Sequence, residues 1–158
     1  MQFTNSELDG LLKQPAPLQF IGADLSGADL NMANLCMANL SGAKLTKADL
    51  RGADLGGANL SKADLSESNM GGADLRAANL RGANLQKANL YRASLDNAIL
   101  YSVDMRDADM RGASMRTIYI RHDGPNRAEM HRAIYDKNTI WTGGIGAFDP
   151  KKAGAILV

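Results

Sequence analysis

The sequence predicts an all-β solenoid, because a pattern of five residues repeats along most of the chain. A leucine, methionine or other large apolar residue stands at every fifth position from Phe20 to Ile120. A small residue, usually alanine, precedes each of these central residues by two positions, with exceptions at Leu18, Ser68, Val103 and Ile118. Glycine recurs two positions after the central residue, as at Gly22, Gly42 and Gly82.

A five-residue period fits neither an α-helix nor a flat strand. A helix turns about 100° per residue, so successive central residues would lie about 140° apart and cover every face. Side chains of a strand alternate between its faces, so an odd period would send successive pairs to opposite sides. Both apolar positions face one axis if the chain turns after each unit, and glycine suits such turns because it tolerates positive φ. The repeat therefore predicts a coil around a leucine core.

The segments GADLS, GADLN, GAKLT, KADLR and RGANL resemble the pentapeptide-repeat family, and the resemblance covers about two-thirds of the chain. It implies a right-handed quadrilateral β-helix with four pentapeptides per coil. Residues 20 positions apart would then stack at roughly the 4.8 Å spacing of neighbouring strands. On this basis, residues 18–120 would form the β-helix, with about five coils.

The residues before the repeat predict a helical cap over segment 1–17. Thr4 and Glu7 have the spacing of a capping box, and Leu8, Leu11 and Leu12 form an apolar stripe before Pro15. We expect a helix over Asn5–Gln14. Such a cap would cover the apolar core that an open β-helix exposes at its end.

Segment 121–158 is predicted to form a second cap at the other end, again with a short helix. Asn126 and Glu129 resemble a capping box, which favours a helix near Arg127–Tyr135. The bulky apolar residues of the tail are expected to plug the end of the rod: Trp141, Phe148, Ile156, Leu157 and Val158. The W…FDP…AG run also resembles tails of cyanobacterial pentapeptide-repeat proteins. Two capped ends favour a monomer.

Composition and charge leave the partner open. The net charge is +1, and the one cysteine, Cys36, excludes an internal disulfide framework. The first residues lack the basic and apolar regions of a signal peptide, and no apolar run is long enough to span a membrane. We therefore expect a cytoplasmic protein without membrane contact.

The polar residues do not predict catalysis, a cofactor or a metal. Aspartate recurs directly before the central residues, but asparagine replaces it freely there, as at Asn34 and Asn79, and a catalytic acid would not tolerate that exchange. His122 and His131 lack metal-ligand spacing, and the glycines do not form a phosphate-binding loop. The chain is predicted not to be an enzyme.

Arginine and tyrosine give the clearest candidate surface. With four units per coil, Arg51, Tyr91 and Arg111 share one face, and Tyr91 lies one coil from Arg111. Arg106, Arg111 and Arg116 fall on three different faces, so they form a belt rather than a stripe. Part of its charge is expected to be neutralised by Asp104, Asp107 and Asp109. The alternative is a solvated surface whose ion pairs have little consequence.

The sequence thus favours a rigid, non-enzymatic scaffold that binds or regulates an unidentified protein. The alternative is a role related to nucleic acid, since some members of the resembled family mimic duplex DNA and protect DNA gyrase. That mimicry needs an acidic rod, whereas residues 18–120 carry 11 acidic and 11 basic side chains. Weak nucleic-acid binding through the arginine belt would depend steeply on salt.

Overall fold

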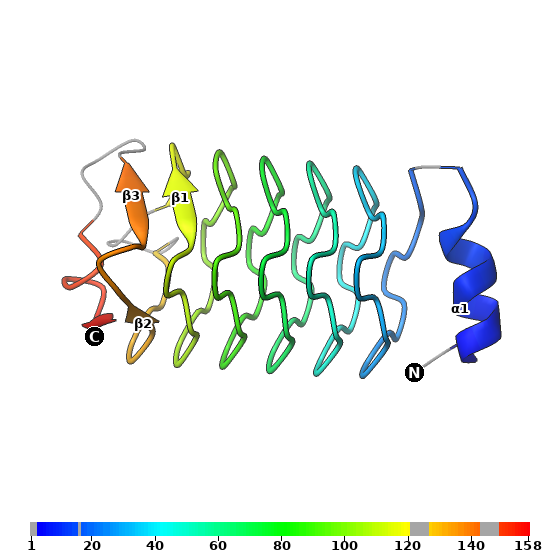
Figure 1. Ribbon diagram of the computed structural model, residues 1–158, viewed down its shortest axis with the longest axis horizontal. Helices are drawn as coiled ribbons and strands as arrows, with labels where there is room; N and C mark the ends of the chain where they lie inside the picture. The colour runs from blue at the N-terminus through cyan, green and yellow to red at the C-terminus, as the bar shows by residue number, and fades with distance from the viewer. Residues whose placement is uncertain (1–2, 16, 121–126, 143–148) are drawn as a thin grey trace.

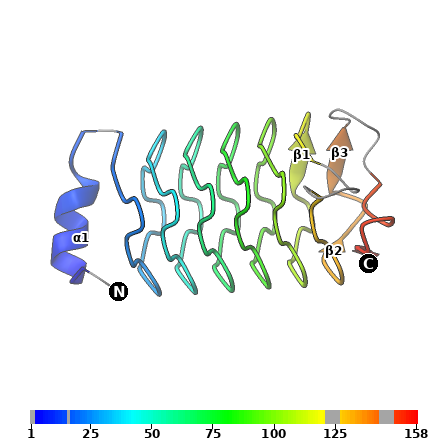
Figure 2. The same cartoon turned by 180° about the vertical axis from the view of Figure 1, so that it is seen from behind.

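The protein is a rod of stacked coils, with one helix across its N-terminal end (Figure 1). The computed structural model describes residues 3–15, 17–120, 127–142 and 149–158. Parallel β-bridges join residues 20 positions apart, from Gln19 with Asn39 to Ile99 with Tyr119. Each coil therefore holds four pentapeptides, and the fold is a β-helix-like solenoid. The view from behind shows the same regular stacking (Figure 2).

Most of the described pentapeptides end in a tight turn, which explains the glycine pattern. The N–H of Ala28 donates to the carbonyl of Leu25 at 3.0 Å, and Gly27 between them has a φ of 68°. A negative φ followed by a positive one is the signature of a type II turn. Lys47 and Lys62 adopt the same left-handed conformation, each with a φ of 60°. Glycine is therefore favoured at this corner but not obligatory.

The core is a column of leucines surrounded by alanines. Leu55, Leu75 and Leu95 are fully buried, and so are the alanines two positions before most central residues, such as Ala78. Hydrogen bonds between coils satisfy the backbone; for example, the N–H of Leu75 donates to the carbonyl of Ser94 at 2.7 Å. Alanine fits beside each leucine because a larger side chain would overpack the narrow interior.

Aspartate and asparagine before the central residues close the turns. The Oδ1 atom of Asp54 accepts the N–H of Gly56 at 2.9 Å, and Oδ1 of Asn89 accepts the N–H of Tyr91 at the same distance. Both residue types supply this acceptor oxygen. Asparagine can also donate to the next coil, as Asn89 Nδ2 does to Asn69 Oδ1 at 3.0 Å. Their free exchange along the chain therefore has a structural cause.

Helix α1, Asn5–Leu12, covers the N-terminal end of the rod. Its predicted capping box is present: Thr4 Oγ1 accepts the N–H of Glu7 at 3.3 Å, and Glu7 Oε2 accepts the N–H of Thr4 at 2.8 Å. The helix is two residues shorter than expected. Leu8 is buried against the core, and the Phe3 ring meets the Phe20 ring edge-on at 6.3 Å.

The predicted C-terminal helix near Arg127–Tyr135 is wrong, because these residues continue the solenoid. Glu129 bridges to Asp104 and Ile134 bridges to Asp109, so the offset between coils grows from 20 to 25 residues. Strand β1, Ser114–Arg116, pairs in parallel with β3, Ile140–Thr142, and β2, Ile134–Tyr135, pairs in parallel with β4, Ile156–Leu157. Asn126, the other half of the expected capping box, lies outside the described residues.

The C-terminal plug forms only in part. The Trp141 ring packs edge-on against the Tyr135 ring, with centroids 6.0 Å apart. Ile156, Leu157 and Val158 are instead 47%, 52% and 62% exposed, because β4 lies at the outer end of the last coil. Phe148 lies outside the described residues. The expectation that the three terminal residues plug the rod is therefore wrong.

Asp136 organises the turn between β2 and β3, and its contacts predict a pH dependence of stability. Burial raises its pKa, but hydrogen bonds from the Gly112 N–H, from Asn138 and from Thr139 outweigh this effect and lower the pKa to about 2. A carboxylate with a lowered pKa in the folded state stabilises that state above its ordinary pKa, near 3.8, and loses this effect as the pH falls toward 2.

We expect Asp136→Asn to lower the melting temperature at pH 7, and the difference from wild type to shrink as the pH falls from about 4 to 2. Thermal melts followed by circular dichroism across this range test the prediction. A difference that does not change with pH would mean that the Asp136 charge is not the cause.

Candidate interaction surface

The structure brings two of the predicted surface residues together on one face. The bridges that join Asp49, Asn69, Asn89 and Asp109 place position 51 above 71, 91 and 111. The Arg111 guanidinium lies 6.0 Å from the centre of the Tyr91 ring, which confirms the predicted neighbourhood. Arg51 is on the same face, but the coil carrying Gly71 separates it from Tyr91.

The predicted arginines are held by acidic neighbours. Arg51, Arg106 and Arg111 each bind the aspartate two positions earlier, with Nη2–Oδ2 distances of 2.5, 2.6 and 2.6 Å. Arg76 makes the same contact with Asp74. Arg116 Nη1 lies 3.7 Å from Asp96 Oδ2. The arginine belt is therefore substantially neutralised within the molecule.

These ion pairs also fix the charge states of their partners. Hydrogen bonds from the Arg111 side chain lower the pKa of the Asp109 carboxyl, and those from Arg51 do the same for Asp49. Hydrogen bonds to Asp109 in turn raise the pKa of Arg111. Both groups of each pair stay charged at neutral pH, so each pair presents a local dipole rather than a net charge.

The coil formed by residues 79–98 differs from its neighbours, because its cations lack such partners. Arg81, Lys87 and Arg92 form no ion pair with any residue that the structure describes. Its one acidic residue, Asp96, is engaged by the Ser114 hydroxyl, at 2.5 Å, and by the backbone N–H of Arg116, at 2.9 Å. The sequence carries the signal for this difference: the positions before its central residues are Asn79, Asn84, Asn89 and Ser94.

Tyr91 and Arg92 form the most distinctive feature of that coil. The Arg92 guanidinium lies 5.0 Å from the Tyr91 ring centre, and Tyr91 remains 40% exposed. A Cβ atom at Gly112 would lie 3.1 Å from Arg92 Cγ, so the Arg92 stem rests on bare backbone. In the preceding coil, the N–H of Gly72 donates to the carbonyl of Tyr91 at 2.9 Å. Gly71 and Gly72 carry no side chains, so the preceding coil presents bare backbone at these two positions.

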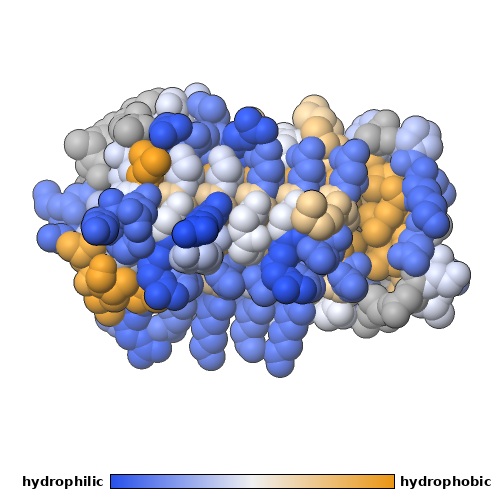
Figure 3. Space-filling view, in the orientation of Figure 1, coloured by the Kyte–Doolittle hydropathy of each residue, from blue (hydrophilic) through white to orange (hydrophobic). Residues whose placement is uncertain are grey.

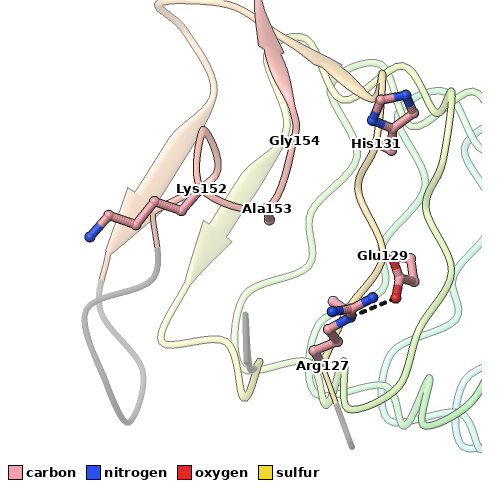
Figure 4. Close-up of a pocket in the computed structure, with 7 residues that line it drawn as sticks. Arg127, Glu129, His131, Lys152, Ala153 and Gly154 are labelled. Atoms are coloured by element: carbon pink, nitrogen blue, oxygen red, sulfur yellow. Dashed lines mark hydrogen bonds and ion pairs between the residues drawn. The ribbon is translucent and has the colours of Figure 1, made fainter. Parts of the chain in front are cut away.

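A hollow of about 250 Å³ near the C-terminal end does not assemble a reactive site (Figure 4). Its lining includes Arg127, Glu129, His131 and Lys152. Arg127 Nε already binds Glu129 Oε1 at 2.7 Å, and Lys152 extends away from His131 and Glu129 (Figure 4). A second hollow of about 150 Å³ lies between α1 and the first coil, beside Leu11 and Phe20. Neither brings an acid, a base and a nucleophile together.

The outer surface is mainly polar on the face that carries β1 and β3. Figure 3 shows hydrophilic side chains along most of this face, with apolar ones beside α1 and at the C-terminal end. In the part of the chain that the structure describes, no cluster of histidine, cysteine, aspartate and glutamate could hold a metal ion. Among the same residues, no helix combines the length and apolar composition needed to cross a bilayer.

The comparison with protein families matches the model of pentapeptide repeats, in 8 copies. The matched residues are 19–57, 43–82, 58–96 and 78–116. They cover most of the solenoid but stop before the coil formed by residues 127–142. A comparison with curated proteins finds no match.

Solved pentapeptide-repeat proteins share the fold. A protein of the Arabidopsis thaliana thylakoid lumen is 28% identical, with a TM-score of 0.50, over 77% of this chain and 76% of that one. HetL, a protein from Nostoc sp. strain PCC 7120 involved in the regulation of heterocyst differentiation, is 28% identical, with a TM-score of 0.55, over 89% of this chain and 66% of its own. QnrB1, a plasmid-mediated fluoroquinolone resistance protein, is 18% identical, with a TM-score of 0.52, over 89% of this chain and 82% of its own.

Proposed function

The chain belongs to the pentapeptide-repeat family, and we propose that it is a non-enzymatic scaffold whose flat outer faces bind a partner protein. In this proposal the rod is a right-handed, four-sided β-helix. The observation that carries it is the column of Arg51, Tyr91 and Arg111, in which an aromatic ring and a guanidinium meet on an open face. Tyrosine and arginine are enriched where proteins bind one another.

The chemistry of the surface supports a binding role rather than catalysis. The described aspartates before the central residues serve largely as acceptors for turn N–H groups, and several also bind arginine. A catalytic acid or base needs a perturbed pKa and a partner within a cleft. HetL, which shares the fold, is named for a part in regulation, and a regulatory role for this chain is part of the proposal.

The nucleic-acid alternative has less support. Duplex mimicry needs a strongly acidic surface, but the acidic and basic residues of 18–120 balance at 11 each. Binding of nucleic acid needs cations that can release counterions from phosphates. Arg106, Arg111 and Arg116 already have carboxylate partners.

A pull-down from native lysate with three baits tests the scaffold proposal. The first bait is the wild type, the second carries Arg51→Ala, Tyr91→Ala and Arg111→Ala on one face, and the third carries Arg106→Ala and Arg116→Ala on other faces. Exposed ion pairs contribute about 0–1 kcal/mol each, so all three baits should fold, and thermal melts check this.

We expect the wild type and the third bait to recover the same partner protein, and the second bait to fail to recover it. Identical protein lists from all baits and from empty resin would contradict the proposal. If nuclease treatment of the lysate abolishes recovery of the partner protein, the nucleic-acid alternative is favoured instead. A cytoplasmic location and a monomeric state remain predictions, and size-exclusion chromatography with light scattering tests the second.

A further inference from the structure

The coil formed by residues 79–98 carries a narrow band of positive charge. It has three cations, Arg81, Lys87 and Arg92, and one carboxylate, Asp96, which Ser114 and Arg116 occupy. Lys87 and Arg92 lie at the two corners that flank Asn89 and Tyr91, so both border the same face. The band is one coil wide, or roughly 5 Å at the spacing of neighbouring strands.

Carboxylates in the two adjoining coils limit this band on both sides. The N–H of Glu67 donates to the carbonyl of Gln86, and the N–H of Lys87 donates to the carbonyl of Arg106, so Glu67 and Asp107 occupy the same corner as Lys87. Glu67 pairs with Lys47 at 3.7 Å, and Arg132 binds Asp107. Arg132 is the main cause of the lowered pKa of Asp107, to which the Lys87 charge adds a smaller effect without forming an ion pair. A chain lying along the rod at this corner would meet alternating charges, whereas one lying across the rod from Lys87 to Arg92 would meet only cations.

We propose that Lys87, Tyr91 and Arg92 bind an extended acidic segment of a partner protein. This inference rests on the proposed scaffold function and names the chemistry of its partner. Carboxylates of the segment pair with Lys87 and with the Arg92 guanidinium, while an apolar side chain packs on the exposed part of the Tyr91 ring. The bare backbone of Gly71 and Gly72 lets the partner's main chain approach closely.

Duplex DNA fits this surface less well than a peptide. Its phosphates are spaced along two strands, and binding needs cations distributed over a comparable area. On this face the coils on either side carry Glu67 and Asp107, and Arg111 is already paired with Asp109. The single positive band matches the width of one extended peptide chain.

Lys87 and Arg92 allow an unusually clean test because both have positive φ, 58° and 56°. Glycine adopts this conformation readily, so Lys87→Gly with Arg92→Gly removes both charges without straining the backbone. Lys62, with a φ of 60°, lies at a different corner and forms no ion pair with a described residue. Lys62→Gly is therefore the matched control.

The probe is a glutamate-rich peptide that contains one phenylalanine, compared with the same peptide carrying glutamine in place of glutamate. Amide chemical shifts of the full chain are followed during titration. We expect changes confined to the amides of Gly71, Gly72, Lys87, Tyr91 and Arg92, and an affinity loss of about tenfold or more in the double variant, equivalent to ~1.4 kcal/mol. Lys62→Gly should bind like the wild type.

Equal binding of the glutamine peptide, equal weakening by Lys62→Gly, or shifts spread over all exposed cations would overturn the inference. Displacement of the peptide by duplex DNA of equal charge would overturn it in favour of nucleic acid. If the pull-down recovers a partner that the Lys87→Gly, Arg92→Gly variant binds as well as the wild type, the scaffold function stands and this surface is wrong.

Discussion

Replacement of Leu75 by alanine is expected to lower the free energy of unfolding by about 2–5 kcal/mol. Leu75 is fully buried, and its alanine variant leaves a cavity that the stacked coils cannot readily close. Leu75→Lys should prevent folding at room temperature, because it would bury an ammonium group without a partner. Urea unfolding followed by circular dichroism measures both effects.

The control is Arg76→Ala, one residue along the same turn. Arg76 is 64% exposed and binds Asp74 at 2.5 Å, so its removal should cost about 0–1 kcal/mol. If Leu75→Ala lowers the free energy of unfolding by no more than Arg76→Ala does, the central role of the leucine column is contradicted. Because coils stabilise only their neighbours, the unfolding transition of Leu75→Ala should also broaden.

The sequence predicted the coils well because one local rule repeats along the chain. Each unit needs alanine and a large apolar residue facing inward and a turn that accepts positive φ. The interchange of aspartate and asparagine was also interpreted correctly as structural, since both close turns through the same oxygen. The capping box of Thr4 and Glu7 was readable because it depends on residues three positions apart.

The C-terminal region was misread because an insertion hid the repeat. The spacing between bridged residues changes from 20 to 25, which is one extra pentapeptide and keeps the five-residue phase. Residues 121–125, RHDGP, have Asp123 and Pro125 where the repeat has a small and a large apolar residue, so the sequence pattern is interrupted after Ile120. The pairs Ala128 with Met130 and Ala133 with Tyr135 still have the spacing of the core positions. A local resemblance to a capping box was given more weight than that spacing.

The number of surface charges and part of their neutralisation were predicted from the sequence, but the full set of ion pairs was not. Counting arginines indicated a basic belt at Arg106, Arg111 and Arg116, but their ion pairs depend on side-chain direction. Part of this was visible in the sequence, since an aspartate stands two positions before Arg106 and Arg111. Asn79 stands in the corresponding place before Arg81. The contacts of Arg92 with the Tyr91 ring and with Gly112 required the three-dimensional structure.

The second large effect is expected at Met130, which tests whether residues 127–142 form a true coil of the solenoid. Met130 is fully buried, and Met130→Ala should lower the free energy of unfolding of the last coil by about 2–5 kcal/mol. Met130→Lys should detach the last coil. The amides of Met105 and Met110, which donate to the carbonyls of Glu129 and Ile134 at 2.7 and 2.8 Å, would then exchange with solvent.

Hydrogen exchange with residue resolution measures this, and His131→Lys is the control, because His131 is the exposed neighbour of Met130. In Met130→Lys, the amide of Leu45 should keep its protection, since it lies several coils away and donates to Asp64 at 2.7 Å. Unchanged protection of Met105 and Met110 would mean that residues 127–142 do not stack on the rod. Loss of protection throughout would mean that the last coil supports the whole solenoid rather than its own end.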